Sequence, residues 1–319
     1  LATLRVWSEA VRGRIWEATD EEVNHFRKLL RFPAGEVTRP PAMPRLLPGG
    51  GPTFQRKASA HQFARRALTT YERRVDFAAM RDGLDALDGR AAALLAPAYQ
   101  KIKEGLLDAA PRLVDGRNIQ GAADLKLKFL KDLELAWRAA MRQAFEAGGR
   151  DAGRELRSAR RETKMAVPED LAAAFEEALS ERSFFITGIE RDAILKKARL
   201  AILRGIEQGT PAKEVMAQLA KLFAEDYALG APRLETIVRT NMTRAYNMGR
   251  RRQFEHPNLE GEVAAYQFSA ILDTRTTEVC QRLDEKVYLT ADPYIDKITP
   301  PLHFNCRSIL VPILRDQPY

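Results

Sequence analysis

Two cysteines and one histidine near the C-terminal end of the chain have the side-chain types and spacing that could perform chemistry. Cys280, His303 and Cys306 carry thiol and imidazole groups, which are good zinc ligands. A closed structural zinc site needs four ligands, and this stretch provides three. The fourth ligand would have to come from one of three further residues: Asp273, Asp284 or His256.

The same two cysteines allow two other interpretations. A Cys280–Cys306 disulfide would close a loop of about 25 residues and would stabilise the fold by roughly 3 kcal/mol in the chain-entropy model. Alternatively, both thiols stay reduced and pack as small hydrophobic groups. Because the cytoplasm favours reduced thiols and the zinc ligands are one short, we favour free thiols or a disulfide over zinc. The sequence therefore predicts no cofactor, with structural zinc as the alternative, and less than one zinc per purified chain.

Polar residues accompany this cluster in the sequence. An Asp–Arg pair from Asp273 and Arg275, with Asn305 bonding local backbone next to Arg307, would hold the loops around short strands. The enzymatic alternative is a DNA- or nucleotide-acting site formed by Asp273, Arg275 and His303. No nucleophile has an evident base, and no second carboxylate is paired at an informative spacing. We therefore favour the structural interpretation and predict that the chain is not an enzyme.

Several sequence signals of common enzymes are missing from the 319 residues. The chain has no Gly-Lys-Ser/Thr phosphate-binding loop, no Gly-x-Ser-x-Gly elbow and no His-Glu-x-x-His helix. The first absence argues against a P-loop ATPase. The other two argue against hydrolases that use a Gly-x-Ser-x-Gly nucleophile elbow or a His-Glu-x-x-His metal-binding helix.

The composition is that of an ordinary globular protein, with 45% hydrophobic and 29% charged residues. No apolar run approaches the roughly 18 residues that a membrane helix needs, so we expect no membrane helix and a protein made in the cytoplasm. The 51 basic and 43 acidic residues give a net charge of +8. This excess is compatible with nearby DNA, although solvated helix faces explain it equally well.

The chain divides into four segments by its residue patterns. Residues 1–32 have helical spacing, 33–60 form a Pro/Gly-rich arm or linker, 61–165 form a helical body, and 166–319 contain helices and then strands. Strands are expected at 263–268, 286–289 and 308–311. Asp115-Gly116 and Gly148-Gly149 are predicted to interrupt the helices of the body. The expected fold is mainly α, with a small α+β C-terminal domain.

A run of three arginines, Arg250, Arg251 and Arg252, lies near the predicted C-terminal end of a helix. Cations at this position interact favourably with the helix dipole. The run is also the candidate DNA-facing patch of the chain, because arginine binds phosphate well.

Two C-terminal motifs carry a resemblance to a known family. The segment from Asp273 to Asp284 (DTRTTEVCQRLD) resembles the tail motif of the phage Mu F-like head morphogenesis proteins, and Pro300 to Arg307 (PPLHFNCR) resembles their closing motif. Upstream, Gly205 through Gly209, Arg239-Thr240-Asn241 and Tyr246-Asn247 are similar to the helical approach to these motifs. The resemblance covers about residues 185–311. The motif residues are Asp273, Arg275, Thr276, Cys280, Asp284, Pro301, His303, Asn305, Cys306 and Arg307.

Two departures separate this chain from the family pattern. Many relatives carry Cys-x-x-Cys in the first motif, where this chain has Thr277 before Cys280. Where relatives usually have Asp-Gly-Lys, this chain has Asp284-Glu285-Lys286. The first departure puts a four-ligand metal site in doubt.

The resemblance implies a structural minor capsid protein of a tailed bacteriophage, present in few copies. Its implied partners are the portal protein, other head proteins and the packaged double-stranded DNA. Its implied locations are the capsid interior or portal vertex of the virion, and the host cytoplasm during assembly, with roles in head assembly and in genome packaging or ejection. A non-specific DNA-binding module is the remaining alternative.

Overall fold

The computed structural model describes residues 77–160, 171–256, 262–271, 276–293 and 295–314. The predicted N-terminal helix (1–32) and the Pro/Gly-rich arm (33–60) lie outside the described residues. So do the motif residues Asp273 and Arg275.

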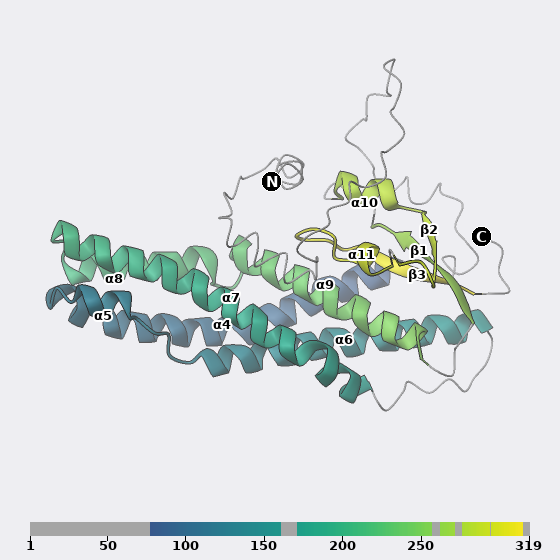
Figure 1. The fold of residues 1–319 in the computed structure, drawn as a ribbon, viewed down its shortest axis with the longest axis horizontal. Helices are drawn as coiled ribbons and strands as arrows, with labels where there is room; N and C mark the ends of the chain where they lie inside the picture. The colour runs from purple at the N-terminus through teal and green to yellow at the C-terminus, as the bar shows by residue number, and fades with distance from the viewer. Residues whose placement is uncertain (1–76, 161–170, 257–261, 272–275, 294, 315–319) are drawn as a thin grey trace, which may run out of the picture. The chain divides into compact units, whose positions relative to one another are not determined.

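Long helices dominate the described part of the chain, which confirms the predicted mainly α class. They run side by side over much of their length (Figure 1). In chain order the helices are α4 (Phe77–Asp115), α5 (Ile119–Ala123), α6 (Leu130–Arg160), α7 (Leu171–Gln208), α8 (Ala212–Asp226) and α9 (Pro232–Phe254).

Glycine and proline set the boundaries of the later helices. Helix α7 ends where Gly209 adopts a φ of 65°, a left-handed conformation that glycine tolerates without strain. The N–H of Thr210 then donates to the carbonyl of Gly205 at 2.8 Å. Pro232 occupies the first turn of α9, where its missing N–H removes no helical hydrogen bond.

A small antiparallel sheet follows the helices, and it confirms the three predicted strands. The strands are β1 (Val263–Ser269), β2 (Val287–Leu289) and β3 (Ile309–Leu314), in the spatial order β2-β1-β3. Tyr266 at the centre of β1 is opposite Tyr288 on one side and Pro312 on the other. Two short helices, α10 (Glu278–Leu283) and α11 (Ile295–Ile298), connect the strands.

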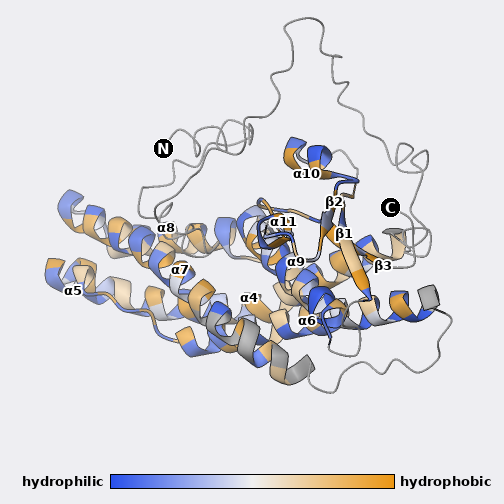
Figure 2. Ribbon diagram, turned by 45° about the vertical axis from the view of Figure 1, so that its right-hand side comes forward, coloured by the Kyte–Doolittle hydropathy of each residue, from blue (hydrophilic) through white to orange (hydrophobic). Residues whose placement is uncertain are grey.

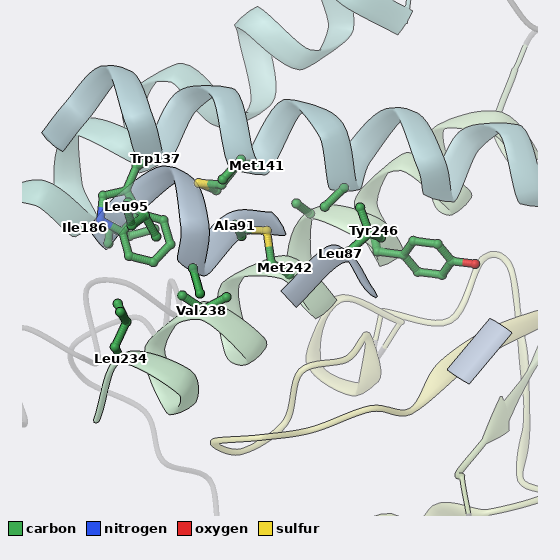
Figure 3. Packing of buried hydrophobic residues seen from close by; sticks show 14 of the residues in the cluster. Leu87, Ala91, Leu95, Trp137, Met141, Ile186, Leu234, Val238, Met242 and Tyr246 are labelled. Atoms are coloured by element: carbon green, nitrogen blue, oxygen red, sulfur yellow. The ribbon is translucent and has the colours of Figure 1, made fainter. Parts of the chain in front are cut away.

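One hydrophobic core joins helices from both sides of the predicted boundary at residues 165/166. Side chains of α4, α6 and α9, including Leu95, Met141 and Met242, point toward one another (Figure 3). Trp137 of α6 and Val238 of α9 are almost fully buried in the same cluster. Hydrophobic and hydrophilic residues alternate along these helices (Figure 2), as expected for helices with one buried face.

The predicted interruption at Gly148-Gly149 is wrong, whereas α4 does end at Asp115 as predicted. Gly148 lies within α6, at the point where this helix crosses α9. A Cβ atom at Gly148 would lie 2.0 Å from the carbonyl oxygen of Tyr246, and one at Gly249 would lie 1.9 Å from that of Phe145. Both glycines therefore allow the backbones of α6 and α9 to come into contact. The spacing of residues in the sequence does not reveal this requirement for glycine.

None of the helices in the described ranges combines the length and the hydropathy that a membrane span requires.

Candidate functional site at the C-terminal motifs

Asn305 of the closing motif binds one face of helix α9. Its backbone N–H donates to the Thr240 hydroxyl at 3.0 Å, and its side-chain Nδ2 donates to the Thr236 hydroxyl at 3.3 Å. Arg239 Nη1 donates to Asn305 Oδ1 at 3.3 Å. Asn305 has a φ of 57°, a left-handed conformation that asparagine tolerates better than most residues. One residue therefore attaches the motif loop to three positions of α9.

A second asparagine connects α9 to the strand that follows the motif. Asn247 is buried, and its Nδ2 donates to the carbonyl of Thr243 at 2.9 Å and to that of Ser308 at 3.1 Å. Arg239 and Thr240 thus bind the closing motif at Asn305, and Asn247 binds the residue that follows the motif, Ser308.

An aspartate from α4 extends this contact network. Arg239 Nε donates to Asp88 Oδ2 at 3.1 Å, so the guanidinium bridges Asp88 and Asn305. Burial raises the pKa of the Asp88 carboxyl to about 7. The charge of Arg239 lowers this pKa and Asp85 raises it further, but burial has the largest effect.

We predict that the Asp88 pKa makes stability depend on pH. The proton binds more tightly to Asp88 in the folded chain than in the unfolded chain, where its pKa is about 4. Its stabilising contribution is complete below about pH 4 and is lost as the pH rises through about 7. The urea midpoint of the parent should therefore fall between pH 5 and pH 8.

The Asp88→Asn variant serves as the control, because the amide oxygen still accepts a hydrogen bond from Arg239 but does not titrate. Its urea midpoint should fall less than that of the parent over the same pH range. Equal slopes for the two proteins would contradict the assignment.

The two cysteines and the histidine come together as the sequence suggested. Cys280 Sγ lies 3.0 Å from His303 Nε2 and 3.8 Å from Cys306 Sγ, and the three donor atoms all lie within 4.8 Å of one another. Both cysteines are buried free thiols. His303 Nδ1 lies 2.7 Å from the carbonyl oxygen of Phe304. The cluster could hold a soft metal ion with three protein ligands, or remain a hydrogen-bonded thiol–imidazole group.

The three groups shift one another's pKa. The hydrogen bond from the Cys280 thiol lowers the pKa of Cys306 well below its usual range, and His303 adds to this effect against the opposing effect of burial. The hydrogen bond to Cys306, together with burial, raises the pKa of Cys280. Burial lowers the pKa of His303, but the interaction with Cys306 outweighs burial and raises it overall.

A small hollow adjoins this cluster. Its volume is about 10 Å³, which is enough for roughly one water molecule or ion. It is lined by Ile271, Thr276, Cys280, His303, Asn305, Arg307 and Ser308.

The remaining described motif residues support the loops around the sheet. The Thr276 hydroxyl donates to the carbonyl of Ile271, and Asp284 Oδ1 accepts the N–H of Ala270 at 2.8 Å. Pro301 follows a cis peptide bond, and Arg307 is buried.

The predicted DNA-facing patch is wrong for Arg250. Its side chain is 1% exposed, and both its Nη atoms donate to the carboxylate of Glu155, at 2.8 and 2.7 Å. Arg251 binds Glu255 and Asp296, so its charge is neutralised within the fold, and Arg252 is exposed. A buried arginine needs a charged partner, and Glu155 lies 95 residues away in the sequence.

Sequence reasoning missed Asp88 and Glu155, the two carboxylates that bind arginines of α9. Both lie in the body at 61–165, which the resemblance does not cover, and their partners are 151 and 95 residues away. No local pattern distinguishes them from the solvated acids on the same helices.

Comparison with known proteins supports the resemblance. Residues 196–311 match the family model described as "Phage Mu protein F like protein". The Mu-like prophage FluMu F protein of Haemophilus influenzae is 28% identical over 145 residues, which are 41% of this chain and 34% of that relative. The chain thus spans about a third of the relative's length. No solved structure matches the chain. The resemblance read from the two C-terminal motifs is confirmed.

Proposed function

We propose, on the premise that residues 196–311 belong to the phage Mu F-like family, that this chain is a non-catalytic minor head protein of a tailed phage. Its proposed partners are the portal protein, other head proteins and the packaged double-stranded DNA. Its proposed place is the portal vertex or capsid interior of the virion, and the host cytoplasm during assembly.

The observation that carries this proposal is the attachment of Asn305 to α9. The residues that carry the family resemblance make contacts inside the molecule, joining the sheet to the helices through Asn305 and Asn247. Such contacts are expected of a folding element that presents a rigid unit to other head proteins.

The surroundings of His303 favour a structural role over the enzymatic alternative. Both ring nitrogens lie within hydrogen-bonding distance of protein groups, Nε2 next to Cys280 and Nδ1 next to the Phe304 carbonyl.

We predict that Asn305→Ala lowers stability and head incorporation together. The change removes the side-chain hydrogen bonds to α9 and leaves polar partners unsatisfied, which commonly costs about 1–3 kcal/mol. The experiment is co-expression of the chain with the portal and head proteins of the same phage. Copies per particle are counted by mass spectrometry and the melting temperature is measured in parallel.

Asn241→Ala is the matched control, because among the described residues the Asn241 amide donates to the carbonyl of Ile237, within α9 itself. It should melt close to the parent temperature and enter heads normally. The parent should co-purify with the portal in few copies, and failure to do so would contradict the portal proposal. If Asn305→Ala and His303→Ala both melt like the parent and enter heads, yet infection fails, the structural role is wrong.

A further inference from the structure

We propose that Cys280, His303 and Cys306 bind one zinc ion, with a fourth coordination position that faces the adjoining hollow. This proposal replaces the expectation of less than one zinc per chain, which rested on the number of ligands and not on their distances. It is independent of the head-protein proposal, since a head protein can contain or lack zinc.

The distance between the two sulfur atoms fits a tetrahedral zinc site. Zinc–sulfur bonds of about 2.3 Å in tetrahedral geometry separate two sulfurs by about 3.8 Å. Cys280 Sγ and Cys306 Sγ are 3.8 Å apart, although no covalent bond joins them. His303 Nε2 lies 3.0 Å from Cys280 Sγ, against an expected separation of about 3.5 Å. His303 Nε2 and Cys306 Sγ lie within 4.8 Å of each other, so zinc binding would require a shift of the half-buried imidazole.

The second ring nitrogen of His303 is positioned as in many zinc sites. Metal-binding histidines almost always donate their other N–H to a carboxylate, a carbonyl or water, which fixes the tautomer. Here Nδ1 lies 2.7 Å from the Phe304 carbonyl oxygen and can donate to it. This hydrogen bond leaves Nε2, the nitrogen that faces Cys280, with its lone pair available for a metal ion.

The backbone holds two of the ligands in a tight turn. The Cys306 N–H donates to the His303 carbonyl at 3.3 Å, and Asn305 adopts its left-handed φ of 57° between them. Asn305 is itself held by Thr236, Arg239 and Thr240 of α9. The third ligand, Cys280, lies in α10. The donors are therefore brought together by the fold, which lowers the entropy cost of binding.

A fourth ligand can come from water or from Thr277. The hollow beside Cys280 and His303 has room for about one water molecule and is lined mostly by polar residues. The Thr277 hydroxyl is buried and lies close enough to the Cys280 thiol to lower the pKa of that thiol. Two thiolates neutralise the charge of Zn²⁺, and their protons are released on binding.

The test is the metal content of the full chain, purified under reducing conditions from zinc-supplemented cells. Elemental analysis should give about one zinc per chain. Replacement of zinc by Co²⁺ should give the near-ultraviolet charge-transfer absorption of cobalt–thiolate bonds. Less than about a tenth of a zinc per chain, with both thiols reduced and no cobalt–thiolate absorption, would overturn the proposal.

Ligand variants locate the ion. Cys280→Ser and Cys306→Ser should each weaken zinc binding at least about tenfold in competition with a chelator. His256→Ala should bind zinc like the parent, because the structure does not bring His256, a candidate fourth ligand from the sequence, into the cluster. Thr277→Cys should retain zinc longer than the parent, because it adds a thiolate beside the ligand Cys280. Full zinc retention in Cys306→Ser would exclude this site. If a serine variant fails to fold, the cobalt spectrum of the parent still decides the proposal.

Discussion

Gly249→Ala is expected to lower the free energy of unfolding by about 3 kcal/mol or more, the upper end of the range for overpacking a core. The added Cβ would lie 1.9 Å from the carbonyl oxygen of Phe145, closer than any real contact. Since the obstacle is backbone and not a flexible side chain, α6 and α9 would have to separate. Urea denaturation, followed by circular dichroism in the far ultraviolet, measures the effect.

Gly89→Ala in α4 is the matched control for this prediction. A Cβ at Gly89 meets nothing within 4 Å, and alanine is a better helix former than glycine by roughly 0.5–1 kcal/mol. The control should therefore be as stable as the parent or more stable. Gly148→Ala, on the opposite side of the crossing, should resemble Gly249→Ala. If all three variants had similar stability, the close approach of α6 and α9 would be wrong.

Arg250→Met is expected to destabilise the protein by about 3–5 kcal/mol, since removing one partner of a buried ion pair leaves the other charge uncompensated. The guanidinium is 1% exposed and binds both carboxylate oxygens of Glu155, whose side chain is 12% exposed. It also lies 5.8 and 5.4 Å from the ring centres of Tyr246 and Phe254, which adds cation–π attraction. Thermal and urea unfolding measure the loss.

Two further variants separate the ion pair from general effects of losing an arginine. Arg282→Met removes an exposed ion pair with Glu278 and should change stability by less than about 1 kcal/mol. The double variant Arg250→Met with Glu155→Leu should recover much of the stability, since no buried charge is left unpaired. If Arg250→Met reduced stability as little as Arg282→Met, the burial of Arg250 would be wrong. Arg250 would then again be a candidate for DNA contact.

These two contacts show how the helices that carry the family resemblance depend on the remainder of the chain. Gly249 and Arg250 lie in the matched segment, whereas Phe145 and Glu155 belong to α6, outside it. The matched segment of 196–311 is therefore completed by a helix that the family match does not include. We expect α6 to be necessary for the stability of any fragment of the chain that contains α9 and the sheet.

Local features of the sequence determined most elements of the described fold. Strands at 263–268, 286–289 and 308–311 follow from runs of β-branched and aromatic residues bounded by polar turns, and the structure has strands at these places. The end of α7 at Gln208 follows from Gly209. Each of these features depends on a few neighbouring residues, so periodicity and turn chemistry suffice to predict it.

The roles of Gly148, Arg250 and the cysteine–histidine cluster were decided only by the tertiary structure. From the sequence, Gly148 is expected to end a helix, and Arg250 is expected to be a solvated cation at a helix terminus. Each is instead placed by a partner roughly a hundred residues away, Tyr246 for the glycine and Glu155 for the arginine. The sequence could count three metal ligands but not their separations. Contacts between distant segments depend on how helices pack, and the same local pattern is compatible with exposure or burial until that packing is known.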